Sequence, residues 1–205
     1  MKLVIKAKTM IAGIFLAGFV LAGFVLAGCS STGYQAGRDA FDRGDYPAAV
    51  KEFKALAEQN DPKGQYALAI MYDMGEGIPQ SAEKAMEYYR ASAEQGYADA
   101  QNNLGVMYDQ GEGVATDYNE AMKWYLLAAE NGNEDAPNNI GVMHMIGLGV
   151  PRNFSMAHKW FTIAGSGDIE ARSNKKFVET RLTPEQIAES KRFAEEWNNN
   201  VLKAK

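Results

Sequence analysis

Apolar residues in the middle of the chain recur at the spacing of one helix face. The set that follows i, i+3, i+4, i+7 spacing consists of Leu104, Met107, Tyr108 and Gly111. A Gly-x-Gly segment at 111–113 comes next, and we expect it to end the helix because glycine adopts a left-handed backbone without strain. The pattern therefore predicts a helix that packs on one side and stops at a glycine turn.

A second helix is predicted after that turn. Asp117 can cap it, because a short side-chain oxygen accepts hydrogen bonds from the free N–H groups of a first turn. Its inner face is formed by Ala121, Trp124, Tyr125, Ala128 and Ala129, and Gly132 ends it. Gly105 on the first helix carries no side chain, so a neighbouring helix can approach closely there. We therefore expect a helical hairpin.

This hairpin is one copy of an internal repeat. Residues 65–100 align with residues 101–136 without a gap, and 16 of 36 positions are identical. A third copy, residues 137–171, is one residue shorter. A single hairpin cannot bury its apolar face alone, so neighbouring copies must stack. The sequence predicts an all-α, right-handed α/α solenoid of about five helical hairpins, without a sheet.

The repeat resembles the Sel1-like repeat family in its spaced glycine, alanine and aromatic positions. Before it, the segment 43–49 followed by Phe53 resembles the turn of tetratricopeptide repeats. After it, Thr183 is the expected cap of a last helix, with Pro184 in its first turn. The domains expected are a tetratricopeptide-like hairpin at 35–64, Sel1-like repeats at 65–100, 101–136 and 137–171, and C-terminal capping helices at 172–205.

The N-terminal residues have the pattern of a secretion signal. Three lysines and no acid lie in the first nine residues, and residues 10–28 are uncharged. The segment Leu26-Ala27-Gly28-Cys29 resembles the lipobox of bacterial lipoproteins. This implies a signal peptide at 1–28, cleavage between Gly28 and Cys29, a lipid on Cys29 and a short tether at 29–34. The alternative is an uncleaved membrane anchor, since 19 residues nearly span a bilayer.

The location follows from the same segment. Ser30, rather than an aspartate, follows the cysteine, which resembles the lipoproteins that enteric bacteria sort to the outer membrane. We expect the chain to be lipid-anchored in the bacterial cell envelope, at the outer membrane and facing the periplasm. Cys29 is the single cysteine, so no disulfide can form within the chain.

Charge argues against nucleic acid as a partner. The chain has 21 Lys and Arg against 26 Asp and Glu, and without residues 1–28 it has 18 against 26. A protein with this balance offers no general attraction to phosphates.

The motifs that could carry catalysis have structural explanations. Ser81 and Lys84, like Ser173 and Lys176, match the Ser-x-x-Lys pattern of penicillin-recognising proteins, but the companion motifs are missing. The repeat equivalents of Ser81 are Asp117 and Asn153, and all three are helix-capping residue types. The secreted Sel1-like proteins linked to penicillin binding carry paired cysteines, which this chain lacks. We expect no catalytic residue.

Metal and cofactor sites are not expected either. His144 and His158 are the only histidines, and they replace Tyr108 and Met122 of the preceding repeat. Those positions pack between helices, and a metal site needs three or four ligands. We interpret both histidines as packing residues and predict neither metal nor cofactor.

The binding surface is predicted on the first helix of each hairpin, which lines the concave side of stacked hairpins. The residues expected there are Tyr66, Asp73, Asn102, Asp109, Asn138 and Met145. Asn102 and Asn138 are repeat partners, so they can form an amide ladder that bonds an extended peptide or a sugar chain. The alternative is that they are merely solvated surface.

The function predicted is a non-catalytic scaffold for protein–protein interaction, tethered to the membrane by its N-terminal lipid. A protein or peptide is the expected partner, and a glycan is the second choice. The alternative functions are an accessory of a cell-wall or glycan-processing enzyme, or a penicillin-interacting Sel1-like protein.

Overall fold

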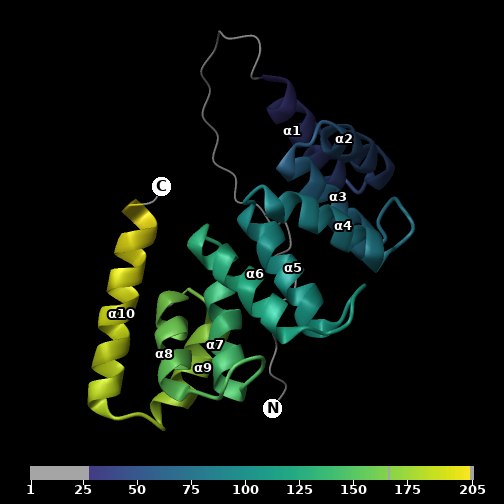
Figure 1. Ribbon diagram of the computed structural model, residues 1–205. Coiled ribbons are helices and arrows are strands. Elements are labelled where there is room, and N and C mark those ends of the chain that lie inside the picture. The colour runs from purple at the N-terminus through teal and green to yellow at the C-terminus, as the bar shows by residue number, and fades with distance from the viewer. Residues whose placement is uncertain (1–27, 166, 204–205) are drawn as a thin grey trace. The chain divides into compact units, whose positions relative to one another are not determined.

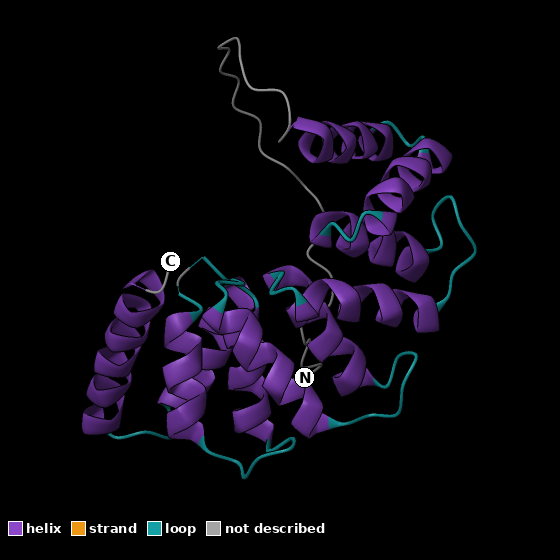
Figure 2. Ribbon diagram, turned by 45° about the horizontal axis from the view of Figure 1, so that its top comes forward, coloured by secondary structure: helices purple, strands orange, loops and turns teal. Residues whose placement is uncertain are grey.

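The computed structural model describes residues 28–165 and 167–203, with side chains for 33–165 and 167–201. These residues form ten helices and no strand (Figure 1, Figure 2). The helices are α1 (Gly28–Asp42), α2 (Tyr46–Glu58), α3 (Pro62–Met74), α4 (Ala82–Glu94), α5 (Ala98–Gln110), α6 (Tyr118–Glu130), α7 (Ala136–Ile146), α8 (Phe154–Ile163), α9 (Ile169–Glu179) and α10 (Pro184–Lys203). The prediction of an all-α chain of about five hairpins is confirmed.

The described helices fall into two compact units. Helices α1 to α4 form one unit, and α5 to α10 form the other.

In the first unit, α1 packs on α2, α2 on α3, and α3 on α4. The core contains Ala40, Ala49, Phe53, Leu56, Ala67, Leu68 and Met71. Helix α1 begins at Gly28, so the segment 29–34 is helical where the sequence had predicted a tether. On this helix, Gly33 lies against Leu56 and Gly37 lies against Phe53.

In the second unit, α5 pairs with α6 and α7 pairs with α8, while α9 packs on α8 and α7. The core around α7 to α9 contains Val142, Met145, Ala157, Phe161, Ala171 and Val178. The last helix, α10, packs along α8 and not mainly against α9, its neighbour in sequence. The last pair of helices is therefore more open than the hairpins before it.

A ring over a glycine holds the two helices of a hairpin together. A Cβ atom built on Gly105 would lie 2.7 Å from the Tyr125 ring, and one on Gly141 would lie 2.5 Å from the Phe161 ring. Both rings are fully buried. The prediction that Gly105 permits close approach is confirmed, and it extends to the equivalent glycine of the next repeat.

The Gly-x-Gly loops end the first helices and then contact another helix. Gly111 closes α5 with a φ of 74°, and its N–H donates to the Met107 carbonyl. The second glycine of the next loop, Gly149, has its Cα so close to the start of α6 that a Cβ would lie 2.9 Å from Tyr118. In the first unit, Gly77 contacts Tyr46 in the same way. These pairs lie 72 residues apart, so the 36-residue period extends to the first hairpin.

Candidate functional site

The six residues predicted to face a groove are buried. Their exposed fractions are 5% for Tyr66, 9% for Asp73, 1% for Asn102, 7% for Asp109, 0% for Asn138 and 4% for Met145. The expected exposure was wrong because each of these first helices packs against its hairpin partner, α3 on α4, α5 on α6 and α7 on α8. A role for these residues in binding stays a prediction that their burial does not favour.

The asparagines do form amide bonds, but between helices. Asn139 on α7 donates from Nδ2 to Asn102 Oδ1 on α5 at 3.0 Å. Asn174 on α9 donates to Asn138 on α7 at 3.4 Å. The ladder anticipated for a ligand is therefore used to join consecutive first helices inside the second unit.

Two of the six residues are acidic groups that lie beside a tyrosine of the second helix. In the first unit, the Tyr89 hydroxyl lies 3.5 Å from Asp73 Oδ2. In the second, burial raises the pKa of Asp109 to about 6. The pKa of Tyr125 is also raised well above its usual value, first by burial and then by the Asp109 charge. Asp109 Oδ2 and the Tyr125 hydroxyl have no hydrogen-bond partner among the described residues.

Sequence reasoning missed this pairing, although the sequence contained a signal for it. Sixteen residues separate Asp73 from Tyr89 and Asp109 from Tyr125. At the same two positions the third repeat has Met145 and Phe161. Where the tyrosine loses its hydroxyl, the aspartate is replaced by an apolar residue as well.

Ser81 of the Ser-x-x-Lys motif is a helix cap. Its hydroxyl accepts a hydrogen bond from the Lys84 backbone N–H at 3.2 Å and donates to Glu83 at 3.0 Å. The Lys84 ammonium lies instead 5.1 Å from the centre of the Tyr72 ring. The prediction that Ser81 caps α4 is confirmed. In the second motif, Ser173 and Lys176 are exposed on α9.

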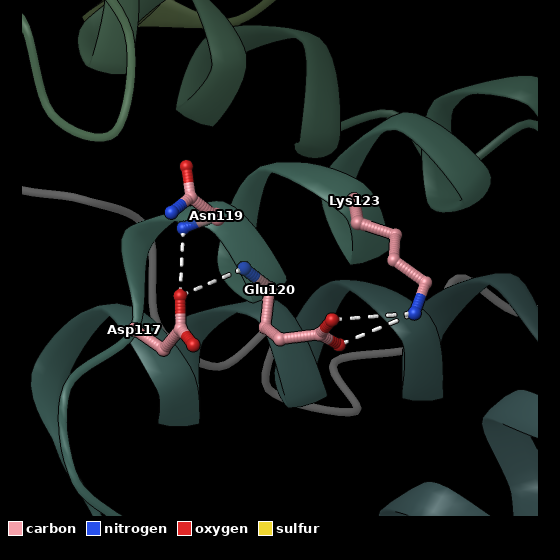
Figure 3. A network of polar contacts seen from close by, with 4 residues as sticks. All are labelled: Asp117, Asn119, Glu120 and Lys123. Atoms are coloured by element: carbon pink, nitrogen blue, oxygen red, sulfur yellow. Dashed lines mark hydrogen bonds and ion pairs between the residues drawn. The ribbon is translucent and has the colours of Figure 1, made fainter.

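The repeat equivalents of Ser81 cap their helices too. Asp117 Oδ1 accepts from the N–H groups of Asn119 at 3.0 Å and Glu120 at 3.1 Å (Figure 3). The Glu120 carboxylate then pairs with Lys123 at 3.3 Å, an exposed contact that adds little stability (Figure 3). Asn153 caps α8 by accepting from the Met156 N–H at 3.0 Å. One position therefore serves capping in all three repeats.

The two histidines lie at packing positions, as predicted. His158 is fully buried, and its Nε2 lies 3.2 Å from Glu179 Oε1. Burial lowers the pKa of His158, while the hydrogen bond to Glu179 opposes that change. Burial also lowers the pKa of His144, which is half-buried. Within the described part of the chain, no group of three or more His, Cys, Asp or Glu is placed to hold a metal ion.

Two of the cavities lined by described residues lie in the second unit. One, of about 420 Å³, is lined by the turns before α7 and α9 and by the end of α10, including Glu134, Asp168 and Trp197. Asp168 already caps α9 by accepting from the Glu170 and Ala171 N–H groups. The other, of about 510 Å³, is lined by Thr162, Gly165, Arg172, Lys175, Lys176 and Glu179. Sequence reasoning missed this second cluster, whose signal is the i, i+3, i+4 spacing of three cations.

A family model described as Sel1 repeat matches residues 62–97, 98–133 and 135–168, which is more than half of the chain. The chain belongs to the Sel1 repeat family. Its helical repeats form a scaffold of the kind that typically mediates protein interaction. The matched segments begin at α3, α5 and the turn before α7, so each Sel1 repeat is one helical hairpin.

Two solved structures resemble this Sel1 repeat chain. A crystal structure of a Sel1 repeat protein from Oxalobacter formigenes is 30% identical, with a TM-score of 0.65 over 70% of this chain and 60% of that one. The structure of c5321, a protective antigen present in uropathogenic Escherichia coli strains and displaying an SLR fold, is 27% identical, with a TM-score of 0.58 over 83% of this chain and 46% of that one. The chain thus matches less than two thirds of either relative's length. A comparison with curated proteins gave no match.

Two sequence expectations concern the membrane. Among the described helices, none is both long and apolar enough to cross a bilayer. The predicted signal peptide and the alternative anchor lie outside the described residues, apart from Gly28. Gly28 and Cys29 are the first two positions of α1, where only the backbone is described.

Proposed function

We propose that this Sel1 repeat protein is a non-catalytic interaction scaffold, tethered in the bacterial envelope by a lipid on Cys29. The repeated helical hairpin is the observation that supports the scaffold function. Three matched repeats supply stacked helices whose polar groups cap helices or join them. Such arrays bind partners along their surfaces.

The anchor is supported by the sequence around Cys29. Small residues at Ala27 and Gly28 precede a single cysteine, and a positively charged start with an apolar stretch precedes them. A lipid is useful to a scaffold because two or more acyl chains hold a protein stably at a membrane surface. The anchor would then restrict the possible partners to molecules that reach that membrane surface.

The test of the anchor is metabolic labelling with palmitate in a bacterial host. We expect the full chain to label and to mature to a shorter form, and Cys29→Ala to remain an unlabelled precursor. Ser31→Ala is the matched control and should label normally. Labelling and maturation of Cys29→Ala would rule out the lipid anchor.

The location has its own test. In an enteric host, membrane fractionation should find the chain in the outer membrane. Ser30→Asp should shift it to the inner membrane, because an aspartate after the cysteine is the inner-membrane signal of enteric lipoproteins. An unchanged distribution would contradict the proposed sorting while leaving the anchor intact.

The scaffold is tested by cross-linking the full chain in living cells and identifying captured proteins. We expect the same envelope proteins to be captured by the parent chain and to be lost when the repeats are disrupted by Met145→Asp. If the parent chain captures no more protein than Met145→Asp does, the scaffolding role is contradicted.

A cell-wall enzyme is the competing function, and its candidates were the Ser-x-x-Lys motifs at Ser81 and Ser173. The Ser81 hydroxyl is engaged as the cap of α4, and Lys84 does not activate it. Turnover of a β-lactam or of peptidoglycan by the purified chain, lost on Ser81→Ala, would reverse this conclusion.

A further inference from the structure

Among the described helices, none forms a hairpin with α9 in the way that α6 does with α5 and α8 does with α7. In the second unit α5 is covered by α6, and α7 by α8. Helix α9 takes the position of the next first helix, because it packs on α8 and α7 and Asn174 bonds to Asn138. The following helix, α10, packs along α8 instead. Among the described residues, one side of α9 is therefore left without a hairpin partner.

That side of α9 is basic. Arg172, Lys175 and Lys176 follow i, i+3, i+4 spacing, so they form one stripe along the helix. Together with Thr162 and Gly165 at the end of α8, they line the cavity of about 510 Å³. The stripe thus borders a concave surface rather than a flat one.

The three cations have no anionic partner in the described structure. No described carboxylate forms an ion pair with Arg172, Lys175 or Lys176. Glu179 lines the same cavity as the stripe, and its carboxylate contacts His158 Nε2 at 3.2 Å. An acidic ligand can therefore pair with the stripe without displacing an existing contact.

The segment that contains the stripe lacks the acidic excess of the chain before it. Residues 33–157 carry nine Lys and Arg against nineteen Asp and Glu. Residues 154–179, which span α8 and α9, carry four against three. Complementary charge guides partners to one part of a surface and excludes others. The contrast makes the α8–α9 region the part of the described chain suited to an acidic partner.

We propose that α9 and the end of α8 form a docking site for an acidic helix of a partner protein. The uncovered position is the one that a second helix occupies in the other hairpins, so a helix fits it. Glutamates at i, i+3 and i+4 on that helix would face the three cations. The inference rests on the proposed function, because it names the partner class of the scaffold.

The test uses the full chain, purified in mild detergent, and a fluorescent helical peptide with glutamates along one face. Binding is measured by anisotropy at low salt. Lys175→Glu/Lys176→Glu should weaken binding about tenfold, since two attractions become repulsions. The matched control, Lys51→Glu/Lys54→Glu, makes the same charge change on exposed positions of α2. It should change affinity less than threefold.

Three outcomes overturn the proposal. One is equal loss of binding in the two double variants, which would indicate general charge attraction. A second is tighter binding of an oligothymidine probe than of the peptide, which would indicate a phosphate site. The third is self-association that Lys175→Glu/Lys176→Glu abolishes, which would place a second copy of the chain there. A peptide with glutamines in place of glutamates should not bind.

The cross-linking experiment separates this proposal from the scaffold itself. Partners captured in cells by the parent chain, and still captured by Lys175→Glu/Lys176→Glu, would exclude the α9 site and leave the scaffold standing. Circular dichroism of the double variant checks its fold, and the exposed or half-buried positions of both lysines lead us to expect no change.

Discussion

The hairpins α5–α6 and α7–α8 share one frame but differ in their interior chemistry. Both place a ring over a glycine, at Gly105 and Gly141. Next to the ring, α5–α6 has Asp109 beside Tyr125, whereas α7–α8 has Met145 beside Phe161. The ring over the glycine is thus common to these two hairpins. The polar pair is an addition that burial makes expensive.

The largest expected effect comes from introducing the aspartate of the polar pair, without its tyrosine, into the hairpin α7–α8. Met145→Asp would place a carboxyl beside Phe161, which offers no hydroxyl. We expect a loss of about 4 kcal/mol in the free energy of unfolding, measured by urea denaturation. Met145→Leu is the control and should cost less than about 1.5 kcal/mol.

Adding Phe161→Tyr to Met145→Asp should recover part of the loss, because the new hydroxyl can donate to the carboxyl. No recovery would mean that the Asp and Tyr of the other repeats are not energetically coupled.

A substitution at the shared frame should have the next largest effect. Gly141→Val places two methyl groups into the Phe161 ring, so helices α7 and α8 must separate. We expect a loss of about 3 kcal/mol in the free energy of unfolding. Gly167→Val is the matched control, because nothing lies within 4 Å of a Cβ at that position. If the two variants lose the same stability, the ring over the glycine is not the cause.

The polar pair should also give the protein a pH dependence. The Asp109 pKa is about 6 in the folded chain, against 3.8 for an ordinary aspartate. As the pH rises, the unfolded chain therefore releases this proton first. The ionisation of Asp109 thus lowers the free energy of unfolding progressively between about pH 4 and 6. This loss persists at pH 7 and is absent below about pH 4.

Asp109→Asn removes the charge and keeps the shape. The free energy of unfolding of this variant, minus that of the parent chain, should rise by about 2 kcal/mol from pH 4 to pH 7. Urea denaturation at both pH values gives the difference. Glu130→Gln, on the exposed end of α6, is a control that should show no such gain.

The smallest effect is expected at the caps, which all three repeats share. Ser81→Ala should lower the free energy of unfolding by about 1 kcal/mol, whereas Ser81→Asp should be nearly neutral. Thermal unfolding followed by circular dichroism is sufficient. A loss on Ser81→Asp as large as on Ser81→Ala would show that capping is not what Ser81 contributes.

Much of the fold was predictable because it depends on local, repeated chemistry. Glycine turns, cap residues and the helix period can each be recognised within one 36-residue copy. The candidate site was less predictable. Asn102 and Asn138 were expected at a surface because one hairpin leaves them uncovered, but Asn139 and Asn174 of later helices reach them. The position of α10 along α8 likewise depends on packing that no single helix specifies.

The contact of Gly149 with Tyr118 bears on how such a chain can evolve. It joins a loop to the second helix of the preceding hairpin, and Gly77 makes the same join with Tyr46. Within each unit, the later hairpin therefore meets the earlier one through the same glycine contact. Duplication of a 36-residue copy can lengthen such an array by reusing this contact, because the copy carries both the glycine and the helix start that receives it.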